Sequence, residues 1–153
     1  MNDRTFELED LLETKEGLLK LKGLVKSEDP DALYVLALAH YDGDYVEKDR
    51  SRCAELLEHA SELGHVPSTH DLGCFYYYGY GFPKEFRNPL KTEELLLQSA
   101  KAGYIASMIF LGEMYRDGNG VSKNITKAKE LFSQGANLGS KEAKTLLERT
   151  NGT

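Results

Sequence analysis

Two cysteines and four histidines are the residues with the clearest potential for chemistry, and their spacing suggests a metal site. His70 and Cys74 are four residues apart, so on a helix they share one face. Cys53 lies on the preceding helical segment, which is expected to pack against that face. Thiolate and imidazole are the ligands that zinc prefers. The sequence therefore allows a metal site made of Cys53, His70 and Cys74.

A structural role for these side chains is the simpler interpretation. Cys53 stands at a position that a small core residue, Ala128, fills further along the chain. A buried thiol of this size behaves as an apolar group. His70 has no fourth ligand at a metal-binding spacing. We therefore expect no metal ion and no cofactor.

The sequence contains none of the common catalytic motifs. It has no Gly-x-Ser-x-Gly, no His-Glu-x-x-His and no phosphate-binding loop. The glycine pairs at 79–81 and 118–120 lack a preceding strand and a following Lys-Ser/Thr, so they indicate chain reversals. We expect a protein that is not an enzyme and has no small-molecule substrate. The alternative is a small enzyme or metal-binding protein that uses Cys53, His70 and Cys74.

A concentration of tyrosine is the strongest sign of a binding surface. Residues 74–82 read Cys-Phe-Tyr-Tyr-Tyr-Gly-Tyr-Gly-Phe. Tyr77, Tyr78 and Tyr80 stand where the matching stretch at 116–119 carries polar residues. Tyrosine offers a large rigid surface with a polar tip and is enriched at binding hot spots. The opposing interpretation is that these rings pack on the following loop and cover Phe82 and Phe86.

Acidic residues and further tyrosines extend this predicted surface. Carboxylates beside aromatic side chains would steer a basic partner toward them. The predicted partner-binding residues are Tyr41, Asp42, Asp44, Tyr45, Tyr77, Tyr78, Tyr80 and Asp117.

Length and charge limit the kinds of partner that the protein can bind and the number of domains that it can contain. The chain has 153 residues and a net charge of −6, which argues against nucleic acid or an anionic membrane as partner. No apolar run is long enough to span a bilayer. The N-terminus lacks the cationic and apolar regions of a secretion signal, and two cysteines are too few for a disulfide framework. We expect a cytoplasmic protein with one domain, residues 1–153, whose partner is another protein.

Three copies of one sequence unit organise the chain. Leu36, Leu72 and Leu111 each begin a copy, and a glycine follows each of them at +7. The copies are 36 and 39 residues apart because the second contains an insertion within residues 83–89. A unit that repeats at this period indicates a stack of supersecondary elements.

Each copy predicts a pair of helices. The first helix carries leucine, aromatic and small residues on one face, and a Gly or Ala beside the key leucine permits close helix approach. The second helix begins at an Asx cap and ends at a glycine. These caps are Asp49, Asn88 and Asn124, and the final glycines are Gly64, Gly103 and Gly139. Residues 4–27 predict two further helices, and residues 141–149 predict a closing helix with a polar outer side.

The pattern Leu-Gly, Tyr, Gly-x-Gly-Val, then Lys-Ala, Ala and Gly resembles the Sel-one-like repeat, a relative of the tetratricopeptide repeat. The resemblance implies an all-α, right-handed α-solenoid of antiparallel helix hairpins, with the first helices along a concave face. Its parts are N-terminal capping helices, three repeats, and a C-terminal capping helix with a tail. They cover residues 1–30, 31–65, 66–104, 105–140 and 141–153.

The resemblance also implies a function. Members of this family usually act as adaptors or scaffolds, and bacterial members include virulence-associated proteins and immunity proteins. We expect a bacterial protein-interaction module, in its sharpest form an immunity protein that neutralises a cognate toxin or effector. A general adaptor in signalling or virulence is the alternative. A cysteine-rich branch described as β-lactamase-like carries a disulfide in each repeat. This chain departs from that branch, so we do not transfer its activity.

Overall fold

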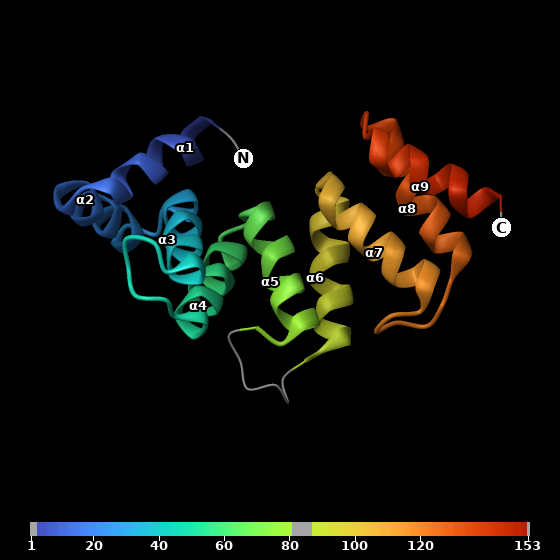
Figure 1. Ribbon diagram of the computed structural model, residues 1–153, viewed down its shortest axis with the longest axis horizontal. Coiled ribbons are helices and arrows are strands. Elements are labelled where there is room, and N and C mark those ends of the chain that lie inside the picture. Colours follow the sequence, from blue (N-terminus) through green and yellow to red (C-terminus); the bar gives the residue numbers. More distant parts are fainter. Residues whose placement is uncertain (1–2, 81–86, 153) are drawn as a thin grey trace. The chain divides into compact units, whose positions relative to one another are not determined.

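The computed structural model describes residues 3–80 and 87–152, which contain helices and no strand (Figure 1). The chain divides into two compact units, Met1–Arg87 and Asn88–Thr153. The first unit contains α1 (Asp3–Glu9), the 3-10 turn η1 (Asp10–Glu13), α2 (Lys15–Lys26), α3 (Pro30–Asp42), α4 (Arg50–Glu62) and α5 (Val66–Tyr78). The second contains α6 (Pro89–Lys101), α7 (Ile105–Asp117), α8 (Ile125–Asn137) and α9 (Lys141–Asn151). The predicted all-α class is confirmed.

Within the first unit, α3 contacts both the N-terminal helices and α4, and α5 packs against α4. Arg4 of α1 pairs with Asp29 and Asp31 at the start of α3. This pairing holds α1 against the first repeat. The acidic residues that follow along α1 and η1 consequently lie beside α3.

The predicted caps of the second helices are confirmed. The side chain of Asp49 accepts a hydrogen bond from the amide N–H three residues later, at 2.9 Å, and Asn88 and Asn124 do the same at 3.0 Å. Each cap satisfies one of the backbone donors that a helix start leaves unpaired. Three matching caps fix the start of the second helix at the same point of each repeat.

Glycines reverse the chain at the ends of the helices, as predicted. Gly64, Gly103 and Gly139 follow α4, α6 and α8 with φ of 85°, 89° and 93°. This left-handed conformation costs glycine little and other residues more. One position of the first repeat breaks the rule, because Tyr45 adopts φ of 65° where the third repeat has Gly120 at 79°.

Small residues let helices approach closely in the second unit. A Cβ atom on Gly112 of α7 would lie 2.5 Å from the Phe132 ring of α8, and one on Gly135 would lie 2.9 Å from the Cβ of Ala143. Phe132 and Ala143 are both fully buried. The glycine beside Leu111 therefore has the packing role that the repeat predicts.

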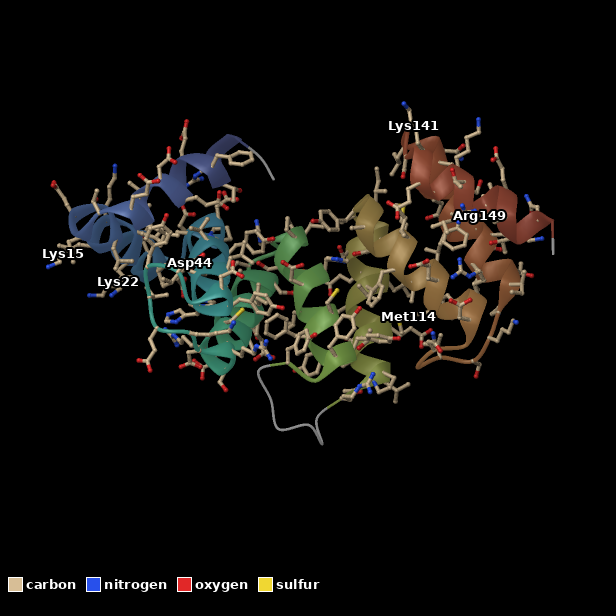
Figure 2. The ribbon with its side chains drawn as sticks, viewed as in Figure 1. Lys15, Lys22, Asp44, Met114, Lys141 and Arg149 are labelled. Atoms are coloured by element: carbon tan, nitrogen blue, oxygen red, sulfur yellow. The ribbon has the colours of Figure 1, made fainter. Side chains whose placement is uncertain are left out.

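The closing helix α9 has one buried face and one polar face. Ala143, Leu146 and Thr150 are buried on the side that packs against α8. Lys141 and Arg149 project away from the ribbon, whereas Met114 of α7 lies inside the unit (Figure 2). This distribution confirms the polar outer side predicted for the C-terminal helix.

Candidate functional site

Four of the predicted tyrosines come together in the first unit as a contiguous aromatic cluster. The Tyr78 and Tyr80 rings are stacked with centroids 5.3 Å apart, and Tyr77 meets Tyr78 edge-on at 4.9 Å. Tyr41 of α3 reaches Tyr80 at 6.3 Å and Phe75 at 5.6 Å. The two repeats thus share one set of rings. We call Tyr41, Phe75, Tyr77, Tyr78 and Tyr80 the aromatic cluster.

A cavity of about 270 Å³ opens beside this cluster. Its walls come from α3, α4, α5 and the residues just after α5. Tyr78 is 49% exposed, so the aromatic wall faces solvent. We call this space the aromatic cavity. It is lined by Leu38, Tyr41, Leu57, Asp71, Cys74, Phe75, Tyr78 and Tyr80.

Asp71 is the charged residue in that lining, and our sequence interpretation missed it. The Tyr34 hydroxyl donates a hydrogen bond to its Oδ2 atom at 2.9 Å. Burial nevertheless raises the pKa of Asp71 to about 6. A signal was present in the repeat, because Asp71 precedes Leu72 at the position where the other repeats carry Val35 and Phe110. An acid in place of two apolar residues marks a position with a different role.

The side chains of two arginines contact rings of the aromatic cluster. The guanidinium of Arg50 lies 4.9 Å from the Tyr80 ring centroid and 5.6 Å from that of Tyr41. Arg87 lies 5.7 Å from the Tyr77 centroid and donates from Nε to the Tyr77 carbonyl at 2.8 Å. These distances are in the range of cation–π attraction. Phe82 and Phe86, against which the rings were alternatively expected to pack, lie outside the described residues.

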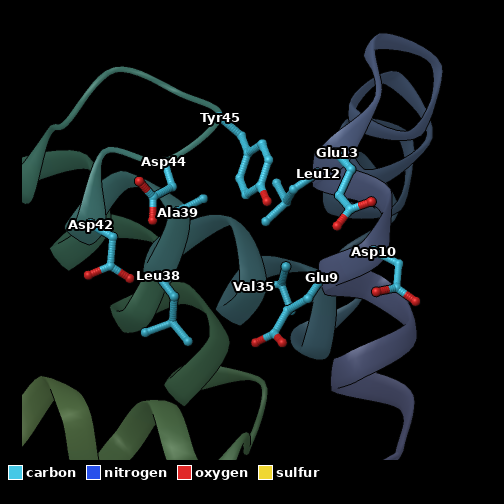
Figure 3. Close-up of a pocket in the computed structure, with 10 residues that line it drawn as sticks. All are labelled: Glu9, Asp10, Leu12, Glu13, Val35, Leu38, Ala39, Asp42, Asp44 and Tyr45. Atoms are coloured by element: carbon cyan, nitrogen blue, oxygen red, sulfur yellow. The ribbon is translucent and has the colours of Figure 1, made fainter.

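Two of the predicted acidic residues, Asp42 and Asp44, line a second cavity, of about 400 Å³. Glu9, Asp10 and Glu13 reach it from α1 and η1, and Asp42 and Asp44 reach it from the end of α3 and the following loop (Figure 3). We call it the acidic cavity. The N-terminal carboxylates were not predicted, since only tertiary packing places them beside α3.

Tyr45 belongs to the acidic cavity and not to the aromatic cluster, although the sequence suggested one continuous patch. Its side chain is 59% exposed and lines the same space as Leu12 and Asp44 (Figure 3). Leu38 of α3 lines both cavities. The two spaces are therefore adjacent, with α3 between them.

Asp117 lies in the second unit and is engaged locally. It accepts two hydrogen bonds from Arg116, each 2.7 Å long. This interaction lowers the pKa of the Asp117 carboxyl. The predicted set of binding residues is thus divided between three places: the aromatic cluster, the acidic cavity and the end of α7.

The cysteine and histidine side chains lie in an environment that disfavours metal ligation. Cys74 Sγ contacts His70 Nε2 at 3.6 Å. Burial raises the pKa values of Cys53 and Cys74 to about 12 and lowers that of His70 to about 4. Both thiols are therefore protonated at pH 7 in the absence of a metal ion. In residues 3–80 and 87–152, no three His, Cys, Asp or Glu side chains are grouped as metal ligands.

A further cavity, of about 290 Å³, lies in the second unit between α6, α7 and α8. Three of its polar side chains bind one another. The Tyr115 hydroxyl donates to Glu93, and Lys127 Nζ donates to the Tyr115 oxygen at 3.2 Å. The first unit therefore holds the better candidate for a binding site.

Within the part of the chain that the structure describes, no helix has the length and apolar character needed to cross a membrane.

Solved structures with a similar fold include three helical-repeat proteins. A Sel1 repeat protein from Oxalobacter formigenes is 28% identical, with a TM-score of 0.76 over 86% of this chain and 97% of that one. The protective antigen c5321 of uropathogenic Escherichia coli, which has an SLR fold, is also 28% identical, with a TM-score of 0.78 over 86% of this chain and 28% of its own. Cysteine-rich protein B of Helicobacter pylori shares the fold at 22% identity, with a TM-score of 0.65 over 84% and 95% of the two chains.

A curated relative is an F-box protein from Arabidopsis thaliana, 26% identical over 114 residues. That match covers 74% of this chain and only a third, 33%, of the F-box protein. The Sel1 repeat family model matches three successive segments, residues 30–65, 66–104 and 105–140. These segments contain most of the helices described above, including both halves of the aromatic cluster. The chain belongs to the Sel1 repeat family, whose members generally mediate protein–protein interactions.

Proposed function

We propose that this protein binds a basic partner protein through the surface of its first unit formed by the aromatic cluster and the acidic cavity. The observation that carries the proposal is the aromatic cluster itself, in which a half-exposed Tyr78 stacks on Tyr80 beside a cavity. Large aromatic side chains in a desolvated pocket provide most of the energy of many interfaces. The flanking carboxylates supply the complementary charge.

The acidic cavity supports a basic partner. It gathers five carboxylates from α1, η1, the end of α3 and the following loop, and the whole chain carries a net charge of −6. Charge of one sign around an aromatic centre accelerates encounter with a partner of the opposite sign and excludes partners of like charge. Because Leu38 lines both cavities, one partner surface can cover both.

The unusual backbone of Tyr45 also supports a binding role. Left-handed φ is unfavourable for a tyrosine, and the third repeat places a glycine at the same position. Strained residues of this kind tend to cluster at functional sites. In this conformation the Tyr45 ring is exposed and can contact a partner.

In its most specific form, we propose that the partner is a toxic effector and that the protein is its immunity protein. The acidic charge suits fast sequestration of a basic toxin, since opposite charges raise association rates. The test is co-expression with the product of a neighbouring gene that arrests growth. Rescue of growth together with a stoichiometric complex would support this form. If the neighbouring product neither arrests growth nor binds, the protein acts as a more general adaptor.

A capture experiment tests the binding surface. We would purify partners on the tagged full chain and compare the wild type with a Tyr78→Ala/Tyr80→Ala variant. The matched control is Leu90→Ala, which removes apolar area from a residue that is 78% exposed in the second unit. We expect the tyrosine variant to lose the partner and the control to retain it. Equal retention by the folded tyrosine variant, or collapse of its fold, would favour a packing role for the rings.

A further inference from the structure

The carboxylate of Asp71 lines the aromatic cavity and is largely withdrawn from water. It receives a hydrogen bond from the Tyr34 hydroxyl at 2.9 Å. Among residues 3–80 and 87–152, no lysine, arginine or histidine lies within ion-pair distance of it. Withdrawing a carboxylate from water without a counter-charge is unfavourable. A cation that enters the cavity would relieve this cost.

The remaining walls of the cavity also suit a cation. Ammonium and guanidinium groups are attracted to aromatic faces within about 6 Å of the ring centroid. Arg50 demonstrates this attraction within the chain, because its guanidinium lies 4.9 Å from the Tyr80 centroid and 5.6 Å from that of Tyr41. Both of these rings line the cavity.

The size of the cavity limits what can enter. Its volume of about 270 Å³ is below the range of about 300–1,000 Å³ that holds drug-sized ligands. A single long side chain fits this space better. Lysine and arginine combine an apolar stem with a charged head, and the cavity offers Leu38 and Leu57 for the stem and Asp71 for the head.

We infer that the aromatic cavity receives one lysine or arginine side chain of the partner, with its charge at Asp71 and its stem between Tyr41, Phe75 and Tyr78. This inference rests on the proposed function and names the chemistry that the partner must present. A purely apolar side chain would fill the cavity but leave the carboxylate without a counter-charge. Cys74 is the thiol in the lining, and the described residues group no three possible metal ligands around it.

Short peptides test the inference without knowledge of the partner. The ¹⁵N-labelled full chain would be titrated with acetyl-Gly-Lys-Gly-amide and acetyl-Gly-Arg-Gly-amide, and with neutral analogues that carry norleucine and citrulline. We expect saturable amide shifts at Asp71, Phe75 and Tyr78 for the cationic peptides, with Kd of about 1–10 mM, as befits one side chain. The neutral analogues should bind at least about tenfold more weakly, because they lack the charge.

Variants locate the charge that is recognised. Asp71→Asn keeps the shape of the side chain and should abolish the preference for cationic over neutral peptides. Glu94→Gln is the matched control, because it removes a carboxylate of the second unit that Lys91 already pairs, and it should leave binding unchanged. Equal binding of norleucine and lysine peptides, unchanged binding by Asp71→Asn, or no saturable shifts at the cavity would each overturn the inference.

The same variants separate this inference from the proposed function. A captured partner that needs Tyr78 and Tyr80 but binds Asp71→Asn as tightly as the wild type would refute the cation pocket and leave the binding surface intact. Cationic peptides that bind at Asp71, together with a captured partner insensitive to the tyrosine variant, would refute the proposed surface and leave the pocket. We expect the partner to bind Asp71→Asn at least about tenfold more weakly.

Discussion

Asp71 and His70, adjacent on α5, affect stability in opposite directions as the pH changes. Burial raises the pKa of Asp71 from 3.8 to about 6, so stability falls as the pH rises through this interval and stays lower above it. Burial lowers the pKa of His70 from 6.5 to about 4, so stability falls as the pH drops through that interval. The two effects largely cancel between pH 4 and 6. The titratable groups near Asp71 include Tyr34, which donates a hydrogen bond to it, and Cys53, which its charge influences. Tyr41, Cys74, Tyr78 and Tyr80 line the same cavity.

Asp71→Asn should therefore stabilise the protein at neutral pH. The shift in the pKa of Asp71 corresponds to a gain of at most about 3 kcal/mol at pH 7, at 1.36 kcal/mol per pKa unit. The gain should shrink as the pH falls below 6 and become small near pH 4, where the wild-type carboxyl is protonated in the folded state and about half protonated in the unfolded state. Urea denaturation at pH 7, 5.5 and 4 measures this. Destabilisation at pH 7 would show that the carboxylate has a structural role and is not kept for binding.

Tyr45→Gly should also increase stability while it weakens binding. The left-handed backbone at Tyr45 costs a non-glycine residue about 1–2 kcal/mol. Part of this gain is offset by the greater freedom of glycine in the unfolded chain. We expect the free energy of unfolding to rise by up to about 1 kcal/mol, measured by urea denaturation. Affinity for the captured partner should fall, because the exposed ring is lost.

Tyr45→Asn is the matched control for this substitution. Asparagine tolerates left-handed φ but offers no aromatic surface, so it should resemble glycine in binding and also relieve strain. A clear loss of stability in both variants would mean that the Tyr45 ring holds the acidic cavity together. In that case its role would be packing and not recognition.

At the scale of the helices, close packing of α7 on α8 depends on Gly112. Alanine there would place Cβ 2.5 Å from a ring carbon of the fully buried Phe132, and an aromatic ring in a packed core cannot move aside cheaply. Overpacking of this kind costs about 1–3 kcal/mol. We expect Gly112→Ala to lower the free energy of unfolding by this amount, as measured by urea denaturation followed by circular dichroism.

Gly23→Ala in α2 is the matched control, because a Cβ there meets no atom within 4 Å. Alanine is favoured over glycine inside a helix by about 1 kcal/mol, so this variant should be stabilised. The two substitutions are chemically identical, and only their surroundings give them opposite signs. A gain of stability in Gly112→Ala would contradict the packing described for α7 and α8.

The helices of this fold could be predicted because the signals for helix starts and helix ends recur in each repeat. Asn88 and Asn124 cap helices at equivalent positions, and Gly103 and Gly139 end them. The site was only partly predictable. The tyrosines of α5 depart visibly from the repeat, whereas Glu9 and Glu13 join the acidic cavity only because α1 and η1 pack beside α3. That packing involves residues outside the repeat and has no counterpart in its pattern.

At the scale of the whole molecule, charge and aromatic surface should control different steps of binding. Charges spread over the surface accelerate diffusional encounter, and their effect is screened within about 10 Å at 0.1 M salt. Side chains buried at the centre of an interface mainly set the rate of dissociation. The net charge of −6 and the acidic cavity should therefore affect the rate of association. The aromatic cluster should affect the rate of dissociation.

The kinetics of the captured partner should separate these two contributions. Raising salt from 50 to 500 mM should slow association by roughly tenfold or more, because steering of a basic partner is screened. An Asp42→Asn/Asp44→Asn variant should associate more slowly at low salt and show a weaker salt dependence, with dissociation little changed. Tyr78→Ala should instead accelerate dissociation. Surface plasmon resonance measures both rates. An association rate that does not change with salt concentration would exclude electrostatic steering by the acidic cavity.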